Sequence, residues 1–420
     1  MKHVFLLAVR SAWNRRLTLG MTLIAITLSV TMLLGVERIR HDAREGFAHS
    51  VSGTDLVVGA RTSPIQLMLY AVFRIGEATN NMRWQSYLDL AAHPDVAWAV
   101  PLSLGDSHHG FPVLATSLAY FEHFRYGDNR PLAFTAGVPF KDIFDAVIGA
   151  EVALRLGYKL GDHIVLSHGV GGIAGIAHAD KPFVVTGILA PTGTPVDRTV
   201  HIGLAAMEAI HLDWQGGAPL PGFSIPQQFV TKFDLTPKEI TAVLVGLKSR
   251  IAVFKMQRYV ADYHGEALMA VLPGVALSQL WQVMGTVEQA LLAVSALVVA
   301  VGLAGLVAVV LAGLNERRRE LAILRSVGAR PREVFALLTL EGLFVTVLGC
   351  LLGVILLAVV SAAVGPLVQA RYGIEVLPRL VSPEELRLLA AVVGVGLLAS
   401  LVPGYRAYRL SLADGLTPRL

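Results

Sequence analysis

The chain has 420 residues, of which 54% are hydrophobic and only 16% are charged, and its mean hydropathy is +0.60. In an ordinary soluble domain about a quarter of the residues are charged, so this composition excludes a typical soluble globular protein. The formal net charge of +4 is modest. The arginines beside the apolar segments account for it, and we expect no nucleic-acid partner.

Four apolar runs are long enough, alone or with their flanks, to cross a membrane. In chain order they are Leu17–Val36, Gln289–Leu314, Phe335–Val364 and Leu388–Val402. A helix of about 20 apolar residues spans the hydrocarbon core of a bilayer, and the fourth run needs residues on both sides to reach that length. The sequence therefore predicts a membrane protein with four transmembrane α-helices.

The first run, Leu17–Val36, follows basic residues, as the apolar core of a cleaved signal peptide does. It is longer than that core usually is, and Gly35–Glu37 offers no cleavage site made of small residues. We therefore expect residues 1–37 to form a cytoplasmic N-terminus and an uncleaved first transmembrane helix.

The segment 38–287, between the first and second helices, is long enough for a folded domain and has an α+β pattern. Helical stretches such as Glu151–Leu156 and Arg250–Tyr263 separate short β-branched runs. The expected strands are Asp55–Val58, Val96–Leu102, Val113–Thr116, His163–His168, Phe183–Leu189, Thr199–Ile202, Ile240–Leu247 and Ala267–Leu272. From Ala276 a helical pattern continues without a breaker into the second membrane helix, which predicts a rigid stalk.

Histidines and aspartates gather in two segments of this predicted domain, namely Asp106, His108 and His109 in one and His168, His178 and Asp180 in the other. Imidazole and carboxylate are zinc ligands, but the spacing matches no compact zinc motif. We therefore assign no metal site and expect solvated loop histidines. Metal binding through His108, His109, His168 and His178 is the alternative.

Nucleotide-binding and catalytic motifs are missing from the sequence. Gly169–Ala174 matches a G-x-G-x-x-A pattern, but no clear helix follows it, so we interpret it as a flexible loop. The chain contains no G-x-x-x-x-G-K-[ST] loop, no H-E-x-x-H and no nucleophile elbow. We expect no enzyme activity and no directly bound cofactor in this chain.

Basic residues indicate which side of the membrane each segment faces. Arginine and lysine are concentrated before the first helix, in the loop 315–334 and in the tail 403–420, whereas the connection 369–387 is balanced. Positively charged loops stay in the cytoplasm. We therefore expect both termini and the loop 315–334 to be cytoplasmic and the segment 38–287 to lie outside.

The third run contains two features that are unusual for a membrane helix. Glu341 places a carboxylate in an apolar helix, where a charge is costly unless it is paired. We expect a structural or interface role near the cytoplasmic membrane surface rather than a proton or substrate pathway. Gly349 and Gly353 allow close helix approach, so we expect helix packing inside the chain, with a subunit interface as the alternative. Cys350, the single cysteine, lies between them, so the outer domain has no disulfide.

The loop and the helix after it resemble the FtsX-like permease family, the MacB/LolC type of ABC transporter permease. The loop Asn315–Ala329 reads NERRRELAILRSVGA. The positions that match the family's loop motif are Glu316, Arg317, Glu320, Leu321, Ala322, Ile323, Leu324, Arg325, Gly328 and Ala329. Glu341 matches the acid at the start of the next helix. The tail Pro403–Leu420 is similar to the family's ending, except for Leu412 in place of a proline and Gly415 in place of an alanine.

The resemblance implies a permease subunit in the bacterial inner membrane. Segment 288–420 would be the FtsX-like transmembrane domain, and segment 38–287 a MacB-like periplasmic domain with an inserted subdomain near Gly216–Lys238. An ABC ATPase subunit, which holds ATP and Mg²⁺, would dock on the loop 315–334. A second permease copy, identical or not, would complete the transporter.

What the resemblance implies for function is mechanotransmission, in which ATP hydrolysis inside moves the periplasmic domain outside. The leading interpretation is export or extraction of an envelope substrate such as a lipoprotein, peptide or drug. The alternatives are signalling to a periplasmic enzyme, with that enzyme as a periplasmic partner, and a metal-linked transport role. A free-standing membrane enzyme is disfavoured because no catalytic set can be assembled.

Overall fold

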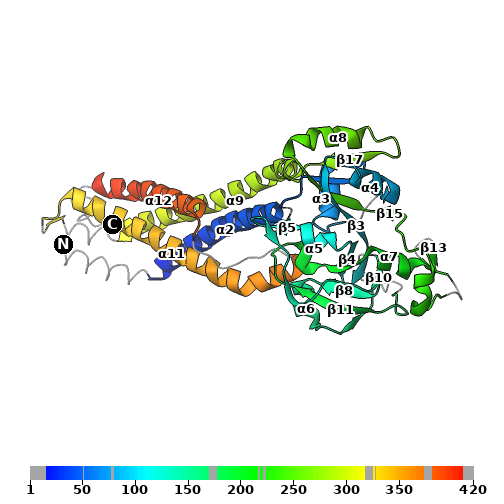
Figure 1. Cartoon of the computed structure of the whole chain (residues 1–420). Helices are drawn as coiled ribbons and strands as arrows, with labels where there is room; N and C mark the ends of the chain where they lie inside the picture. The colour runs from blue at the N-terminus through cyan, green and yellow to red at the C-terminus, as the bar shows by residue number, and fades with distance from the viewer. Residues whose placement is uncertain are drawn as a thin grey trace. The chain divides into compact units, whose positions relative to one another are not determined.

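The computed structural model describes residues 16–50, 52–76, 80–169, 177–215, 218–220, 224–316, 325–326, 328–372 and 381–409 (Figure 1). The chain divides into two compact units. One comprises Met1–Asp42 and Gly285–Leu420, and the other comprises Ala43–Met284. The sequence predicted domain boundaries at 37/38 and 287/288, whereas this division of the structure lies at 42/43 and 284/285.

The first unit is a helical bundle. Its helices are α2 (Arg16–His49), α9 (Pro273–Glu316), α11 (Pro331–Tyr372) and α12 (Pro383–Arg409), of which α2 and α9 continue into the second unit. All four are long and apolar enough to cross a membrane. Each contains one of the predicted runs and extends beyond it. Helix α12 continues through Pro403 to Arg409, so the predicted tail begins as helix, and 410–420 lie outside the described residues.

The second unit is an α+β domain built on an 11-stranded mixed sheet. The strand order is β17 (Leu268–Val271), β1 (Leu56–Ala60), β16 (Ala242–Leu247), β3 (Val96–His108), β4 (Phe111–Thr116), β12 (Val200–Gly203), β8 (Asp145–Ile148), β11 (Phe183–Leu189) and β7 (Phe134–Gly137). Two short strands join from the side: β10 (Ser167–His168) pairs with β3, and β9 (His163–Ile164) pairs with β11.

Short helices cover this sheet. They are α3 (Pro64–Ala71), α4 (Trp84–Ala91), α5 (Ala119–His123), α6 (Ala150–Leu156), α7 (Leu204–His211) and α8 (Val253–Ala261), with the 3₁₀ turns η1 (Pro195–Arg198), η2 (Gln227–Lys232) and η3 (Arg250–Ala252). Small two-stranded pairs lie apart from the main sheet, namely β13 (Trp214–Gln215) with β14 (Ala218–Pro219), β15 (Glu239–Ile240) with β2 (Met82–Arg83) and β5 (Arg125–Tyr126) with β6 (Arg130–Pro131).

All eight predicted strand regions are strands in the structure, but two of them are divided. The run His163–His168 becomes β9 and β10, which pair with different partners. The run Ile240–Leu247 is broken at Thr241, whose side-chain hydroxyl accepts a hydrogen bond from Leu104 N at 3.0 Å. The sequence analysis did not predict the strands β7 and β8 of the main sheet or the helices α3, α4, α5 and α7, which are four to eight residues long.

Candidate functional site

The predicted ATPase-coupling loop lies between α9 and α11. Of its residues, Arg317, Glu320, Leu321, Ile323 and Leu324 lie outside the described residues. Glu316 is the last residue of α9. Gly328 has a φ of +108°, a backbone conformation that glycine adopts readily, and its N–H donates to Arg325 O at 3.1 Å. Together with Ala329, Gly328 leads directly into α11.

The start of α11 is capped by its own first turn. Pro331 stands at the first helical position, which suits a residue without an N–H. The side chain of Glu333 accepts a hydrogen bond from Arg330 N at 2.9 Å. Glu341 is partly buried and lies ten residues after Pro331, so it is about 15 Å along the helix from that point.

Helix α2 packs against α11 through glycines. A Cβ atom at Gly349 would lie 2.6 Å from Ile26 Cγ2, and one at Gly353 would lie 2.8 Å from Val30 Cγ1. The hydroxyl of Thr31 donates to Gly353 O at 3.2 Å. The structure therefore places both predicted packing glycines at a contact between two helices of the same chain.

An ion pair joins α2 to the start of α12. Arg38 Nε and Nη2 donate to the two carboxylate oxygens of Glu385 at 2.9 and 3.1 Å, and the side chains are only 3% and 1% exposed. Glu385 also accepts from Ser382 N at 2.9 Å, while Ser382 Oγ accepts from Glu385 N at 3.2 Å. These reciprocal bonds form a capping box, so one carboxylate both caps α12 and anchors it to α2.

Helices α2 and α9 are also joined by polar contacts near the division between the two units. Within the bundle, Arg40 bonds Glu37 at 2.6 Å and lies 3.6 Å from Glu288 of α9. Within the α+β domain, the guanidinium of Arg44 lies 5.4 Å from the ring centre of Trp281, also on α9. Both units therefore contain a contact between the same two helices.

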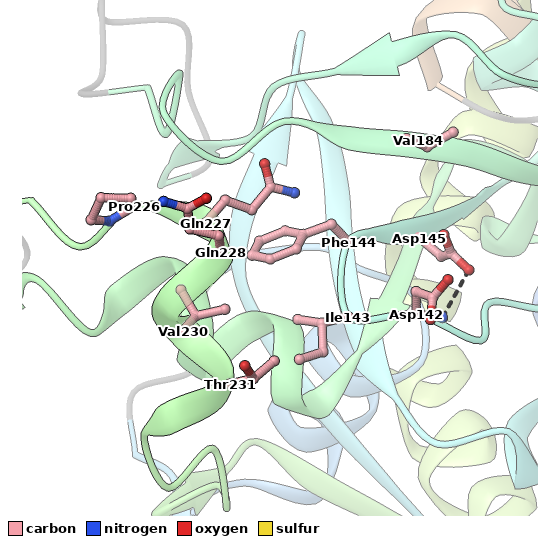
Figure 2. A pocket seen from close by; sticks show the side chains of 10 residues that line it. All are labelled: Asp142, Ile143, Phe144, Asp145, Val184, Pro226, Gln227, Gln228, Val230 and Thr231. Carbon is pink, nitrogen blue, oxygen red and sulfur yellow. Dashed lines mark hydrogen bonds between the residues drawn. The ribbon is translucent and has the colours of Figure 1, made fainter.

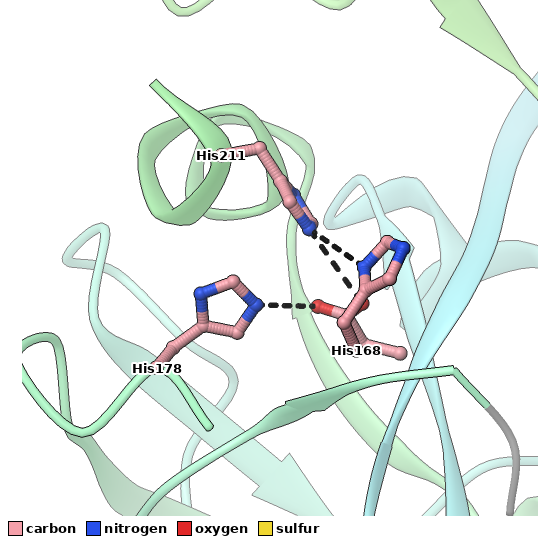
Figure 3. Close-up of side chains that lie close together, drawn as sticks. His168, His178 and His211 are labelled. Carbon is pink, nitrogen blue, oxygen red and sulfur yellow. Dashed lines mark hydrogen bonds and ion pairs between the residues drawn. The ribbon is translucent and has the colours of Figure 1, made fainter. Parts of the chain in front are cut away.

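Three histidines and one aspartate meet in the α+β domain (Figure 3). Asp106 of β3 and His168 of β10 are opposite each other in an antiparallel pair, which brings their side chains together. His178 follows the bridge between Ser167 and Ala177, and His211 is the last residue of α7. One ligand atom from each of Asp106, His168, His178 and His211 lies within 4.8 Å of the others. We call these four residues the histidine–aspartate cluster.

Most of the cluster is shielded from solvent. The side chains of Asp106 and His178 are 0% exposed, whereas that of His168 is 40% exposed. Trp214 of β13 packs against the cluster, with its ring centre 4.2 Å from that of His178 and 5.6 Å from that of His211. The cluster therefore has an indole wall and one side open to solvent at His168.

Burial and hydrogen bonding shift the histidine pKa values in opposite directions. The hydrogen bond with Asp106 raises the pKa of His168. Burial lowers the pKa of His178 to about 4, so its ring is neutral near pH 7. His211 Nδ1 is 2.8 Å from Met207 O, and because a carbonyl oxygen only accepts, this nitrogen carries the hydrogen. In neutral His211 the lone pair of Nε2 then faces the cluster.

The sequence pointed to only part of this cluster. His108 is buried elsewhere, with Nδ1 2.7 Å from Val165 O and Nε2 2.9 Å from Tyr158 OH, and burial lowers its pKa. His109 is exposed beside it. Asp180 bonds Lys181 at 2.9 Å. His211 was missed because it is a lone histidine far along the chain, with no local spacing that could signal it.

A separate groove of about 800 Å³ lies between η2 and the segment before β8 (Figure 2). Phe144, Ile143 and Val230 give it apolar walls, and glutamines of η2 line its other side. Asp145 borders the groove, but its Oδ2 already accepts from the N–H groups of Lys141 and Asp142 at 2.9 Å. The groove is therefore less organised for binding a charged ligand than the histidine–aspartate cluster.

Comparisons with known proteins match both units. Residues 17–255 match the family model of the MacB-like periplasmic core domain, and residues 292–412 match that of the FtsX-like permease C-terminal region. The chain is 25% identical over 314 residues to the lipoprotein-releasing system transmembrane protein LolC of Neisseria meningitidis serogroup B, and the match covers 69% of each chain.

Two solved structures of transporter domains match about half of the chain at low TM-scores. The periplasmic region of MacB from Actinobacillus actinomycetemcomitans is 10% identical with a TM-score of 0.33, covering 55% of this chain and 94% of that one. The extracellular domain of the noncanonic ABC-type transporter YknZ from Gram-positive bacteria is 14% identical with a TM-score of 0.30, covering 52% of this chain and 99% of that one.

The family assignment rests on the matches to the two family models. The periplasmic core match spans more than half of the chain, and the permease match spans most of α9 together with α11 and α12. With four membrane-length helices and a large α+β periplasmic domain between the first two, the architecture agrees with both matches. The chain belongs to the FtsX-like permeases with a MacB-like periplasmic core domain, and it is a multi-pass inner-membrane permease of a bacterial ABC transporter of the MacB/LolC type.

Proposed function

We propose that this permease is a mechanotransmitter. A separate ATPase subunit hydrolyses ATP in the cytoplasm, and the permease converts the ATPase cycle into movement of the periplasmic domain. That movement extracts or exports an envelope substrate. The observation that carries this proposal is the continuity of α2 and α9, each of which extends from the bundle into the periplasmic domain as one unbroken helix.

The lengths of these helices support a stalk outside the membrane. Helix α2 has 34 residues and α9 has 44, which correspond to about 51 and 66 Å at the rise of an α-helix. The hydrocarbon core of a bilayer is about 30 Å thick. Both helices are therefore longer than the membrane requires. The contacts of Arg40 with Glu288 and of Arg44 with Trp281 hold α2 and α9 together in the proposed stalk.

The cytoplasmic loop 315–334 is the proposed docking site of the ATPase. It is rich in arginine, and Leu321, Leu324 and Val327 recur at helical spacing along one edge. The chain has no phosphate-binding loop of its own, so ATP and Mg²⁺ would be held by the partner. The positive charge near this loop and near both termini supports their cytoplasmic location. A second permease copy would complete the transporter.

A lipoprotein is the substrate class that we favour. The support is the similarity to LolC, whose name describes a lipoprotein-releasing system. The periplasmic domain would act on the substrate, which would not need to pass between the membrane helices. Peptides or drugs are the other substrates that this type of movement could serve.

Replacing Leu324 with Asp tests the docking site. An unpaired carboxylate in an apolar contact should weaken ATPase binding by about 2–5 kcal/mol. Co-purification of the ATPase from native membranes should be lost, while the permease reaches the membrane at normal levels. Ser326→Asp is the matched control, because it adds the same charge on the opposite side of the predicted helix. Wild-type recovery of the ATPase with Leu324→Asp would show that this loop is not the coupling element.

A further inference from the structure

We propose that the periplasmic domain binds one zinc ion through Asp106, His168, His178 and His211. The inference is independent of the mechanotransmission proposed above, since it concerns the metal affinity of one domain. The sequence left open metal binding through His108, His109, His168 and His178, and the site proposed here has a different set of ligands.

Among the described residues, the buried Asp106 carboxyl group is paired with histidines and with no lysine or arginine. Its side chain is 0% exposed, and its Oδ2 has no hydrogen-bond partner among the described residues. A buried carboxylate is costly unless it is paired. Lys181 acts electrostatically on His178, but its ammonium group is 2.8 Å from Asp213 Oδ2 and 2.9 Å from Asp180 Oδ2, so it is already paired. A divalent cation between the imidazoles would supply the missing positive charge.

The spacing of the ligand atoms fits a small tetrahedral ion. His168 Nδ1 is 3.1 Å from Asp106 Oδ1 and 3.2 Å from His211 Nε2. His211 Nε2 and His178 Nε2 each lie 3.7 Å from a carboxylate oxygen of Asp106. Ligand atoms at about 2.0–2.1 Å from a tetrahedral zinc are about 3.3–3.4 Å apart. These four pairs, which use Oδ1 of Asp106 for His168 and His211 and Oδ2 for His178, lie within about 0.4 Å of that value, and one ligand atom from each residue lies within 4.8 Å of the others.

The surroundings hold the histidines as ligands. Metal-binding histidines usually donate their second ring N–H to a carbonyl or carboxylate, which fixes the tautomer. His211 does so through Met207 O. Both ring nitrogens of His178 are buried without a hydrogen-bond partner among the described residues, so this ring is available to bind a metal. Trp214 packs on the rings of His178 and His211 and so limits their rotation.

The donor set selects zinc over the common alkaline-earth ions. Three imidazole nitrogens and one carboxylate form a typical zinc environment, whereas Ca²⁺ and Mg²⁺ take mainly oxygen ligands. The exposed side of His168 gives an ion access from the solvent. Because the ligands come from β3, β10, the segment after the Ala177 bridge and the end of α7, a bound ion would tie these elements of the domain together.

Metal analysis of the full-length permease in detergent tests this site. After chelation and reloading with ZnCl₂, we expect one zinc per chain by elemental analysis, with an affinity measured by competition with a chromophoric chelator. Asp106→Asn keeps the shape of the side chain and removes its charge. Removing a residue that only hydrogen-bonds a metal ligand typically lowers metal affinity by roughly 10–100-fold. Asp106→Asn alters a ligand itself, so it should weaken zinc binding by more than that. His178→Ala should do the same.

Two controls make the result decisive. His109→Gln and His264→Gln alter exposed histidines of the same domain and should keep wild-type zinc content. Binding of Co²⁺ to the wild-type protein should quench part of the tryptophan fluorescence, through Trp214 beside the cluster, and give the strong visible bands of a four-coordinate ion. Absence of stoichiometric zinc in the wild-type protein, or unchanged affinity in Asp106→Asn, would overturn the proposal.

Discussion

The carboxylate of Glu385 makes two stabilising contacts. It caps α12 through Ser382, and it pairs with the buried Arg38 of α2. Its neighbour Glu384 is 42% exposed and pairs with Arg387 on the surface. A surface pair contributes little, whereas removing one partner of a buried pair leaves an uncompensated charge. Two adjacent glutamates of the same helix therefore differ sharply in what they contribute to stability.

Substituting these two glutamates separately measures that difference. Glu385→Gln should destabilise the bundle by about 3–5 kcal/mol, because Arg38 then stays buried without its counter-charge. Glu384→Gln should change stability by less than about 1 kcal/mol. The apparent melting temperature of the purified permease in detergent gives the comparison. Equal melting temperatures for the two variants would mean that the Arg38–Glu385 pair does not hold α2 to α12.

Close helix packing in the bundle depends on small residues at the contacts. Gly353 faces Val30 and the backbone of α2, whereas Gly394 of α12 has nothing within 4 Å of where a Cβ would lie. Both glycines are in helix interiors, where alanine is favoured over glycine by about 1 kcal/mol. The same substitution should therefore have opposite effects at the two positions.

Gly353→Ala should lower the melting temperature, because the new methyl group would push against the stiff, β-branched Val30. Gly394→Ala should leave it unchanged or raise it slightly. Thermal unfolding of both variants in the same detergent checks the prediction. If Gly353→Ala were as stable as Gly394→Ala, α11 would not pack tightly against α2 at Gly353.

The sequence predicts elements well where the physical signal is local. Membrane helices and β-branched strands such as Phe183–Leu189 are visible as continuous patterns, and the structure confirms both. The histidine–aspartate cluster depends on strand register and on the end of α7, so no local spacing reveals it. His168 and His178 were among the candidates, but His108 was too, and only the pairing of β3 with β10 separates them. Tertiary pairing, rather than composition, defines this site.

At the scale of the whole molecule, two unbroken helices connect a membrane bundle to a domain with its own sheet and core. Helices α2 and α9 are the covalent links between the two units, so the proposed mechanism transmits movement through them. The proposed mechanism therefore requires that these helices stay stiff. Gln282, an exposed residue inside α9, offers a place to interrupt one of them without touching the domain core.

The most direct test measures whether the periplasmic domain moves when the ATPase is trapped with ADP and vanadate. Spin labels are attached at Leu154→Cys and Arg387→Cys, both exposed positions, in a Cys350→Ala background, and they report the distance between domain and bundle. Unlabelled chain is added so that only pairs of labels within one chain contribute. We predict that trapping shifts this distance in the otherwise wild-type protein and in Gln282→Ala. Gln282→Pro, which breaks the helix at a cost of about 3 kcal/mol or more, should keep its ATPase but lose the shift. An unchanged distance on trapping, or a full shift in Gln282→Pro, would contradict mechanotransmission through α9.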